Sequence, residues 1–137
     1  MSFAASLALQ KAVYGALSGD IALNDLVGGA VFDAVPPGDE PDLYVLLGPE
    51  RVRDRSDVTA AGSLHDFTVA VVSEASGYST AKRAAGLVFD LLTGTQPALE
   101  RGQLVSLRFL NAVARRKSKG SAGRQVDLTF RARIDDI

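Results

Sequence analysis

The chain has 137 residues, 47% of them hydrophobic and 23% charged, with a formal net charge of −1. This length favours one domain over residues 1–137, and the hydrophobic share is enough for a folded core rather than disorder. The lack of cysteine excludes disulfides, thiolate metal sites and a cysteine nucleophile. No apolar run approaches the roughly 20 residues that cross a bilayer, so we expect no membrane partner.

The near-neutral net charge conceals an asymmetry along the chain. Residues 1–50 carry seven acidic side chains against one lysine, a balance of −6. Residues 103–126 carry six basic side chains and no acidic one, a balance of +6. Such a split creates a directional field that can steer association. The basic segment could therefore find its counter-charge on a second copy of the chain.

The N-terminal third predicts two helices and a short strand. Leu9, Val13 and Leu17 recur at a four-residue step, which indicates a helix over residues 3–17 that Ser2 could cap. Asp20 is placed to cap a short second helix that ends at a glycine pair. The segment AVFDA is typical of a short strand, and the prolines of VPPGDEPD then predict a loop.

Residues 42–74 predict a long antiparallel hairpin. DLYVLLG is an apolar strand, RVRDRSDV continues it in polar alternation, and SLHDFTVAVVSE returns. An apolar strand that becomes charged along its length suggests a ribbon that leaves the core for solvent.

A third helix and a second hairpin complete the predicted fold. TAKRAAGLVFDLLTG has an apolar stripe of small residues that suits packing against a sheet. QLVSLRFLNAVAR places Val105, Leu107 and Phe109 on one face, and RQVDLTFRARID alternates cleanly between apolar and polar residues. The fold class is therefore α+β, a mostly antiparallel mixed sheet with long hairpins, packed on one side by helices.

No group of residues forms a catalytic, cofactor or metal site in this sequence. The single histidine, His65, neighbours Asp66, but adjacent strand residues point to opposite faces and cannot act as a base and its orienting partner. Zinc-ligand spacing, calcium-loop spacing and glycine-rich phosphate loops are all absent. We expect a protein without enzymatic activity and without a cofactor.

The basic segment ARRKSKGSAGR, residues 114–124, lies at the predicted tip of the second hairpin. It could bind phosphates without sequence preference, dock on acidic protein surface, or simply be a solvated turn. It has no aromatic residue on which a base could stack, and the chain as a whole is slightly acidic.

Several segments, in order along nearly the whole chain, resemble one protein family. They are ALQKAVYGALSGD, VGGAVFDAVPPG, DLYVLLGPERVRDRSD, LHDFTVAVVSEASGYSTAKRAAGLVFDLL, LVSLRFLNAVARR and VDLTFRARI. The sequence is similar to the tail-terminator or tail-completion proteins of phages with long non-contractile tails, of prophages and of gene transfer agents. The order of the segments carries the resemblance rather than any single motif.

The resemblance implies a structural protein of the particle, made in the bacterial cytoplasm. Such proteins form a hexameric ring at the head-proximal end of the tail tube, stop its polymerisation and join it to the head-completion or stopper protein. Genomic double-stranded DNA passes through the bore without sequence-specific binding. The alternatives are a head-closure or neck connector and a non-specific DNA-binding module.

Two sets of residues follow as candidate contacts. A ring needs two different patches that meet on neighbouring copies. The predicted subunit interface pairs a basic with an acidic set: Arg115, Arg116, Lys117, Lys119 and Arg124, against Asp33, Asp39, Glu40 and Asp42. The projecting ribbon is the predicted contact for tube or stopper: Arg51, Arg53, Asp54, Arg55 and Asp57.

Overall fold

The computed structural model describes residues 2–34, 41–56, 61–94, 96–118 and 122–136. The elements are η1 (Ser2–Ala5), α1 (Ser6–Ser18), α2 (Ile21–Val27), β1 (Val31–Phe32), β2 (Leu43–Asp54), β3 (Gly62–Ser73), α3 (Ser79–Gly94), β4 (Gln103–Arg116) and β5 (Arg124–Asp135). Within these residues no helix is both long and apolar enough to cross a bilayer.

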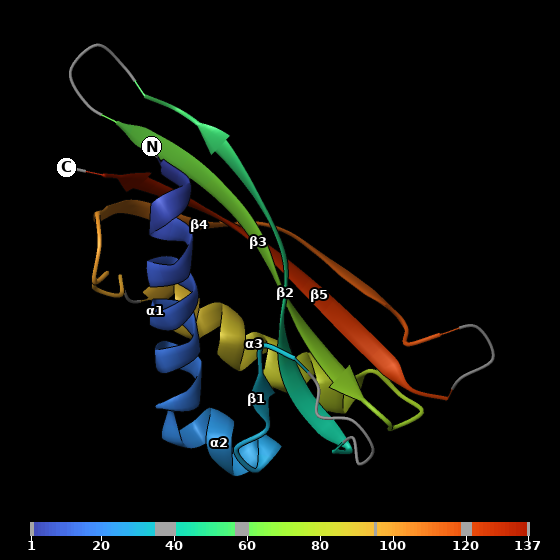
Figure 1. Ribbon diagram of the computed structural model, residues 1–137. Coiled ribbons are helices and arrows are strands. Elements are labelled where there is room, and N and C mark those ends of the chain that lie inside the picture. Colours follow the sequence, from blue (N-terminus) through green and yellow to red (C-terminus); the bar gives the residue numbers. More distant parts are fainter. Residues whose placement is uncertain (1, 35–40, 57–60, 95, 119–121, 137) are drawn as a thin grey trace.

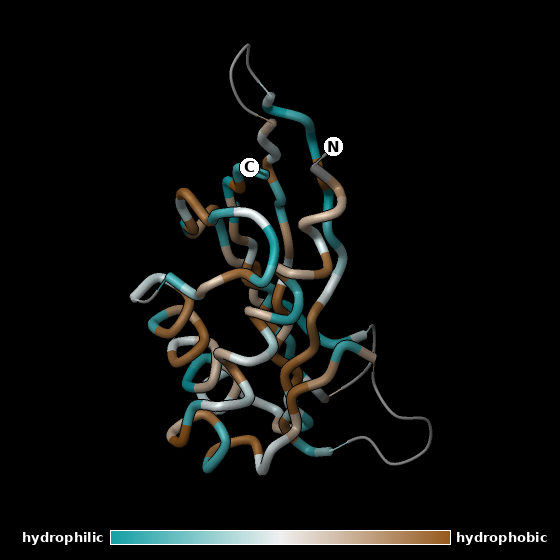
Figure 2. The backbone as a smooth tube through the Cα atoms, turned by 60° about the vertical axis from the view of Figure 1, so that its left-hand side comes forward, coloured by the Kyte–Doolittle hydropathy of each residue, from teal (hydrophilic) through white to brown (hydrophobic). Residues whose placement is uncertain are grey.

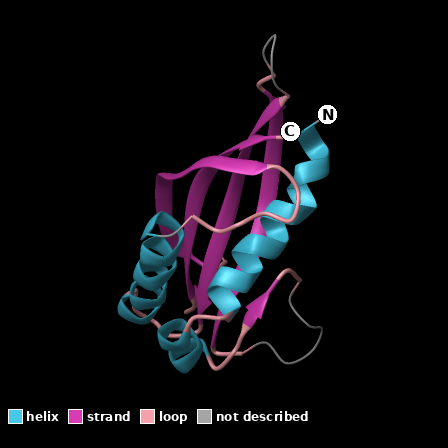
Figure 3. Cartoon of the chain, turned by 90° about the vertical axis from the view of Figure 1, so that its left-hand side faces the viewer, coloured by secondary structure: helices cyan, strands magenta, loops and turns pink. Residues whose placement is uncertain are grey.

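The strands form one five-stranded sheet in the order β1-β2-β3-β5-β4. The short β1 runs parallel to β2, and every other pair is antiparallel. The helices lie together on one side of this sheet (Figures 1 and 3). The predicted α+β class is confirmed, and so are both hairpins.

The core lies between the helices and one face of the sheet. On β5 the predicted alternation is confirmed, because its apolar residues are buried while the residues between them are half-buried: Val126, Leu128, Phe130, Ala132 and Ile134. The stripe of α3 packs onto them with small side chains, including Ala81, Ala84 and Ala85. Small alanines let the helix axis approach the sheet closely, so the layers bury more apolar surface.

The two hairpins point to opposite ends of the sheet (Figure 1). The β2–β3 hairpin extends beyond the helices at the end where both chain termini lie, and the β4–β5 hairpin extends at the other end. The first hairpin closes where the Arg55 amide donates to the Gly62 carbonyl at 2.8 Å. Hydrophilic colouring runs along its β2 strand toward the connection in Figure 2. The predicted departure of this ribbon from the core is therefore confirmed.

Three bulges interrupt the regular strand pairing among the described residues. One shifts the β2–β3 register between Leu47 and Glu50. The other two lie in the β4–β5 pairing, between Leu104 and Ser106, where Val105 has no paired residue, and between Phe109 and Asn111. The prediction that Val105 shares a face with Leu107 and Phe109 is therefore wrong, because an inserted residue inverts the alternation on one side of the bulge.

The helix ends follow the sequence with one exception. The Asp20 side chain accepts a hydrogen bond from the Leu23 amide at 2.9 Å, and Gly28 ends α2 with a positive φ of 63°. Glycine tolerates this left-handed conformation at a helix C-terminus. At the chain start a 3-10 turn precedes α1, whose cap is Ala5 rather than the predicted Ser2.

Candidate assembly surfaces

The helix-free face of the sheet carries a set of arginines that we call the guanidinium row: Arg51, Arg53, Arg108, Arg131 and Arg133. Register places Arg51, Asp66, Arg131 and Arg108 side by side across four strands. The Arg131 guanidinium donates two hydrogen bonds to the Asp66 carboxylate, at 2.7 and 2.9 Å. Arg53 approaches the same carboxylate at 3.6 Å. Asp66 therefore pairs with more than one arginine, and the helix-free face keeps a net positive charge.

This arrangement shifts the pKa values of the central pair apart. The hydrogen bond from Arg131 is the largest cause that lowers the pKa of Asp66, and the charges of Arg131, Arg53 and Arg51 act in the same direction. Partial burial opposes the shift, since desolvation disfavours the charged carboxylate. The same hydrogen bond raises the pKa of Arg131.

Most of the basic residues predicted for the subunit interface have partners within the chain. Arg115 pairs with Asp127 at 3.1 Å, and Lys117 pairs with Glu74 at 2.8 Å. The Arg124 guanidinium lies over the Tyr78 ring, 5.2 Å from its centroid. Arg116 is exposed and has no ion-pair partner in the described part of the chain. Lys119 lies outside the described residues.

The acidic set is only partly covered by the structure. Asp33 is exposed and accepts a hydrogen bond from the Gln10 amide at 3.5 Å. Asp42 is exposed at the start of β2, whereas Asp39 and Glu40 lie outside the described residues.

Most of the predicted ribbon contacts lie at the projecting end of β2. Arg51 and Arg53 belong to the helix-free face, and Asp54 holds the turn through Ser56, whose hydroxyl donates to it at 2.7 Å. Arg55 is exposed beyond the strand end, and Asp57 lies outside the described residues.

A polar array that runs from buried Ser63 and His65 to the surface at Glu50 lies on the opposite, helix-covered face. His65 Nδ1 is 3.3 Å from Glu50 Oε2, and His65 Nε2 is 2.6 Å from Ser63 Oγ. The Ser6 hydroxyl on α1 donates to the other oxygen of Glu50. The array thus ties the β2–β3 hairpin to the start of α1. Asp66 faces the guanidinium row instead, which confirms that His65 and Asp66 do not form a couple.

Ser63, His65 and Glu50 are hydrogen-bonded one after the other, as the serine, histidine and acid of a hydrolytic triad are. However, Ser63 and His65 are both fully buried, so the serine oxygen is out of reach of a substrate. We therefore interpret the array as a structural link. Sequence reasoning missed it because Glu50 reaches the helix-covered face only through the bulge after Leu47. The serine and histidine two residues apart on one strand face were the only visible signal.

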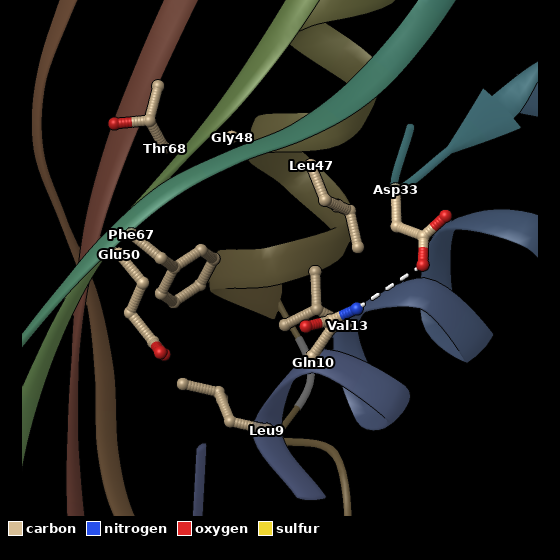
Figure 4. A pocket seen from close by; sticks show the side chains of 9 residues that line it. All are labelled: Leu9, Gln10, Val13, Asp33, Leu47, Gly48, Glu50, Phe67 and Thr68. Atoms are coloured by element: carbon tan, nitrogen blue, oxygen red, sulfur yellow. Dashed lines mark hydrogen bonds between the residues drawn. The ribbon is translucent and has the colours of Figure 1, made fainter. Parts of the chain in front are cut away.

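A cavity of about 140 Å³ lies between α1 and β2 at this bulge (Figure 4). Leu9, Val13 and Phe67 form its apolar wall, and Gln10 and Asp33 stand at one side, joined by their hydrogen bond. Its lining is mixed and it is small, which does not suit a cofactor. Among the described residues there is no cluster of three side chains that could hold a metal ion.

Comparison with known proteins identifies the family. The model of the family described as tail completion protein gp17 matches residues 11–135. The chain belongs to this family. Among solved structures it is similar to a chain in the virion of a native gene transfer agent particle, with a TM-score of 0.91 and 50% identity over 97% of this chain and 98% of that chain. None of the curated proteins matches. The resemblance read from the sequence is confirmed.

Proposed function

We propose that this protein is a tail terminator of a virion or gene transfer agent particle. It forms a hexameric ring at the head-proximal end of the tail tube, ends tube polymerisation and joins the tube to the head-completion or stopper protein. The genome passes through the bore of this ring. The protein acts as a structural part, without a cofactor.

The similarity to a chain of a gene transfer agent virion, over nearly the full length of both chains, carries this proposal. The family name refers to completion of the tail, which favours the tail side of the joint over a head-closure or neck connector. The internal pairing of Arg115 and Lys117 leaves less free charge at the hairpin tip, which argues against a DNA-binding module.

The hairpins at opposite ends of the sheet suit a ring with two different partners. If the strands run along the ring axis, one hairpin meets the tube and the other meets the head side. One of these axial contacts would then include the predicted ribbon residues: Arg51, Arg53, Asp54, Arg55 and Asp57. Docking there would also cover strand edges, which are otherwise templates for pairing with other chains.

Particle assembly without the protein tests the role directly. We expect tails of uncontrolled length that fail to join heads, since nothing would stop the tube or bind the stopper. Heads that leak DNA beside tails of normal length would indicate a neck connector instead. Electron microscopy of both particle populations distinguishes these outcomes.

A shortened hairpin tests the axial contact. Replacing residues 56–61 by Asn-Gly keeps the Arg55–Gly62 closure and the buried Ser63, because a two-residue turn of this kind suits an antiparallel hairpin. We expect normal rings but defective length control or head joining. Joined tails of normal length would contradict the assignment of this ribbon.

The interface charges need a variant that leaves the internal pairs intact. Arg116→Glu changes an exposed side chain, whereas Arg115 and Lys117 pair with Asp127 and Glu74 in the same chain. If Arg116 meets acidic surface of a neighbour, reversal should weaken the ring by about tenfold or more, as expected for like charges brought together. Arg83→Glu, at another exposed arginine, is the matched control.

DNA passage through the bore requires weak contact with phosphates and none with bases. Binding of duplex DNA to the assembled ring should be weak and independent of sequence, and should fall steeply as salt is raised. Tight or sequence-selective binding would favour the DNA-binding alternative.

A further inference from the structure

The outer face of α1 and of the η1 turn before it carries exposed apolar side chains, which we call the α1 stripe: Phe3 on η1, and Leu7 and Tyr14 on α1. Their exposed fractions are 63, 56 and 42%. The stripe points away from the core residues Leu9 and Val13 of the same helix. A hollow of about 370 Å³ lies beside it, lined by Leu7, Tyr14 and Phe32 and by the polar residues Gln10, Lys11 and Asp33. Contiguous exposed apolar surface of this kind marks an interaction site.

A second set of exposed apolar side chains wraps around the free edge of β4, and we call it the β4 edge patch: Phe89 and Phe109 on the helix-covered side, Val113 opposite Asp127 on the helix-free side, and Val105 at the bulge between them and the strand start. Their exposed fractions lie between 37 and 52%. The rings of Phe89 and Phe109 meet edge to face at 5.1 Å, so α3 and the strand share the patch. The outer edge of β4 has no neighbouring strand among the described residues, although Gln96 caps the Leu104 carbonyl at 2.6 Å.

The two surfaces belong to different elements, a helix and an edge strand, and lie on different sides of the fold. α1 packs beside β1 and β2, at one end of the strand order, and β4 is the strand at the other end. A surface that met its own copy would give a closed dimer, whereas two different surfaces that meet each other produce a ring or a filament.

Charge agrees with contact between these two surfaces. Exposed Asp33 borders the hollow beside the α1 stripe, and Lys11, which also lines this hollow, pairs with Glu100 at 3.1 Å. Exposed Arg108 and Arg116 lie on the strand that carries the β4 edge patch. Opposite charge around an apolar centre is the usual arrangement of a specific interface.

We propose that the β4 edge patch of one copy packs on the α1 stripe of the next copy, and that this contact repeats to close the ring. The inference rests on the proposed ring for the number of copies, but the pairing of the surfaces is separate from it. The contact buries the exposed phenylalanines and shields the free edge of β4.

Glutamate substitutions in the two surfaces test the pairing. Leu7→Glu and Val113→Glu each place a charge in one surface at an exposed position, so the fold should survive, which circular dichroism can verify. By native mass spectrometry, we expect the wild-type chain to form rings and each variant to be monomeric. Ile21→Glu, which changes an apolar residue that is 79% exposed on α2, is the control and should form rings.

Mixing the two variants gives a sharper result. Each variant keeps the surface that the other has lost, so a mixture should form a one-to-one heterodimer that cannot extend. Rings formed by either variant alone, or a mixture that stays monomeric, would overturn the pairing while leaving the ring proposal intact. A wild-type chain that is monomeric at all concentrations would overturn both.

Cysteine pairs extend the test to assembled particles, because the chain has no cysteine of its own. Leu7→Cys and Val113→Cys in one chain should give a ladder of disulfide-linked copies after mild oxidation. Each single variant should stay uncrosslinked. Crosslinked dimers from a single variant would show that a surface meets its own copy, which contradicts the proposal.

Discussion

Arg131 and Asp66 face each other on adjacent strands, and the guanidinium donates a hydrogen bond to each carboxylate oxygen. Arg53 and Arg51 reach toward the same carboxylate from the other side. A single acid on β3 therefore binds or attracts cations from both neighbouring strands, β2 and β5, on the helix-free face. Two parallel hydrogen bonds hold a guanidinium more firmly than one, so this pair fixes the register of the sheet where the first hairpin leaves the body.

Asp66→Asn should destabilise the fold at neutral pH and have little effect in acid. The pKa of Asp66 is lowered in the folded protein. Its pairing therefore contributes stability above the ordinary value near 3.8 and loses it as the pH falls through the lower, folded-state value. Thermal unfolding from pH 2 to pH 7 should show the wild-type and variant curves converge in acid. An equal difference at every pH would contradict the ion pair, and Asp42→Asn, at an exposed carboxylate, serves as control.

Ser63→Ala should destabilise the fold by about 1–3 kcal/mol, because it leaves a buried histidine nitrogen without its hydrogen bond. Ser63 and His65 are fully buried, so water cannot replace the lost partner without entering the core. Urea denaturation measures the change. Ser106→Ala, at an exposed position of β4, should alter the unfolding free energy by less than about 0.5 kcal/mol. A Ser63→Ala variant as stable as wild type would show that the array is not a structural link.

The parts of the fold that follow regular periodicity could be predicted from the sequence. The alternation of Val126, Leu128 and Phe130 and the cap at Asp20 depend on local spacing alone, and both are present. Charge and composition also indicated the projecting ribbon and the basic hairpin.

The parts that depend on register or on cross-strand contacts could not be predicted. The bulge after Leu47 turns Glu50 toward His65, and no pattern in the sequence marks that shift. The basic tip has no acidic residue near it in the sequence, because Lys117 and Glu74 are far apart along the chain and pair only once β3 and β4 are in place. Apolar residues at the surface, such as Leu7 and Val113, match the helical and strand patterns of core residues, so exposure becomes visible only in the fold.

Two glycine-to-alanine changes should have opposite effects. A Cβ on Gly48 would lie 3.0 Å from the Thr68 carbonyl oxygen, so the bulge must shift against the backbone of β3. We expect a loss of about 1–3 kcal/mol from this overpacking. A Cβ on Gly86, at an exposed position of α3, would meet nothing within 4 Å, and alanine should stabilise that helix by about 0.5–1 kcal/mol. Chemical denaturation of both variants checks the signs; a neutral Gly48→Ala would mean that β2 does not need the close approach.

Two phenylalanines should separate folding from assembly. Phe130 is fully buried between the rings of Phe67 and Phe109, at centroid distances of 5.7 and 5.8 Å. Phe130→Ala should lower the free energy of unfolding by about 3–5 kcal/mol, because the lost contacts leave a cavity in a packed core.

Phe3 is exposed on the α1 stripe, so Phe3→Ala should leave the free energy of unfolding of the monomer within about 0.5 kcal/mol of wild type. If the stripe is a subunit contact, the same variant should weaken ring formation by tenfold or more, since a buried aromatic at an interface contributes over 1 kcal/mol. Denaturation of the monomer and mass measurement across a dilution series test the two effects separately, and a Phe3→Ala chain that forms rings as tightly as wild type would remove this residue from the contact.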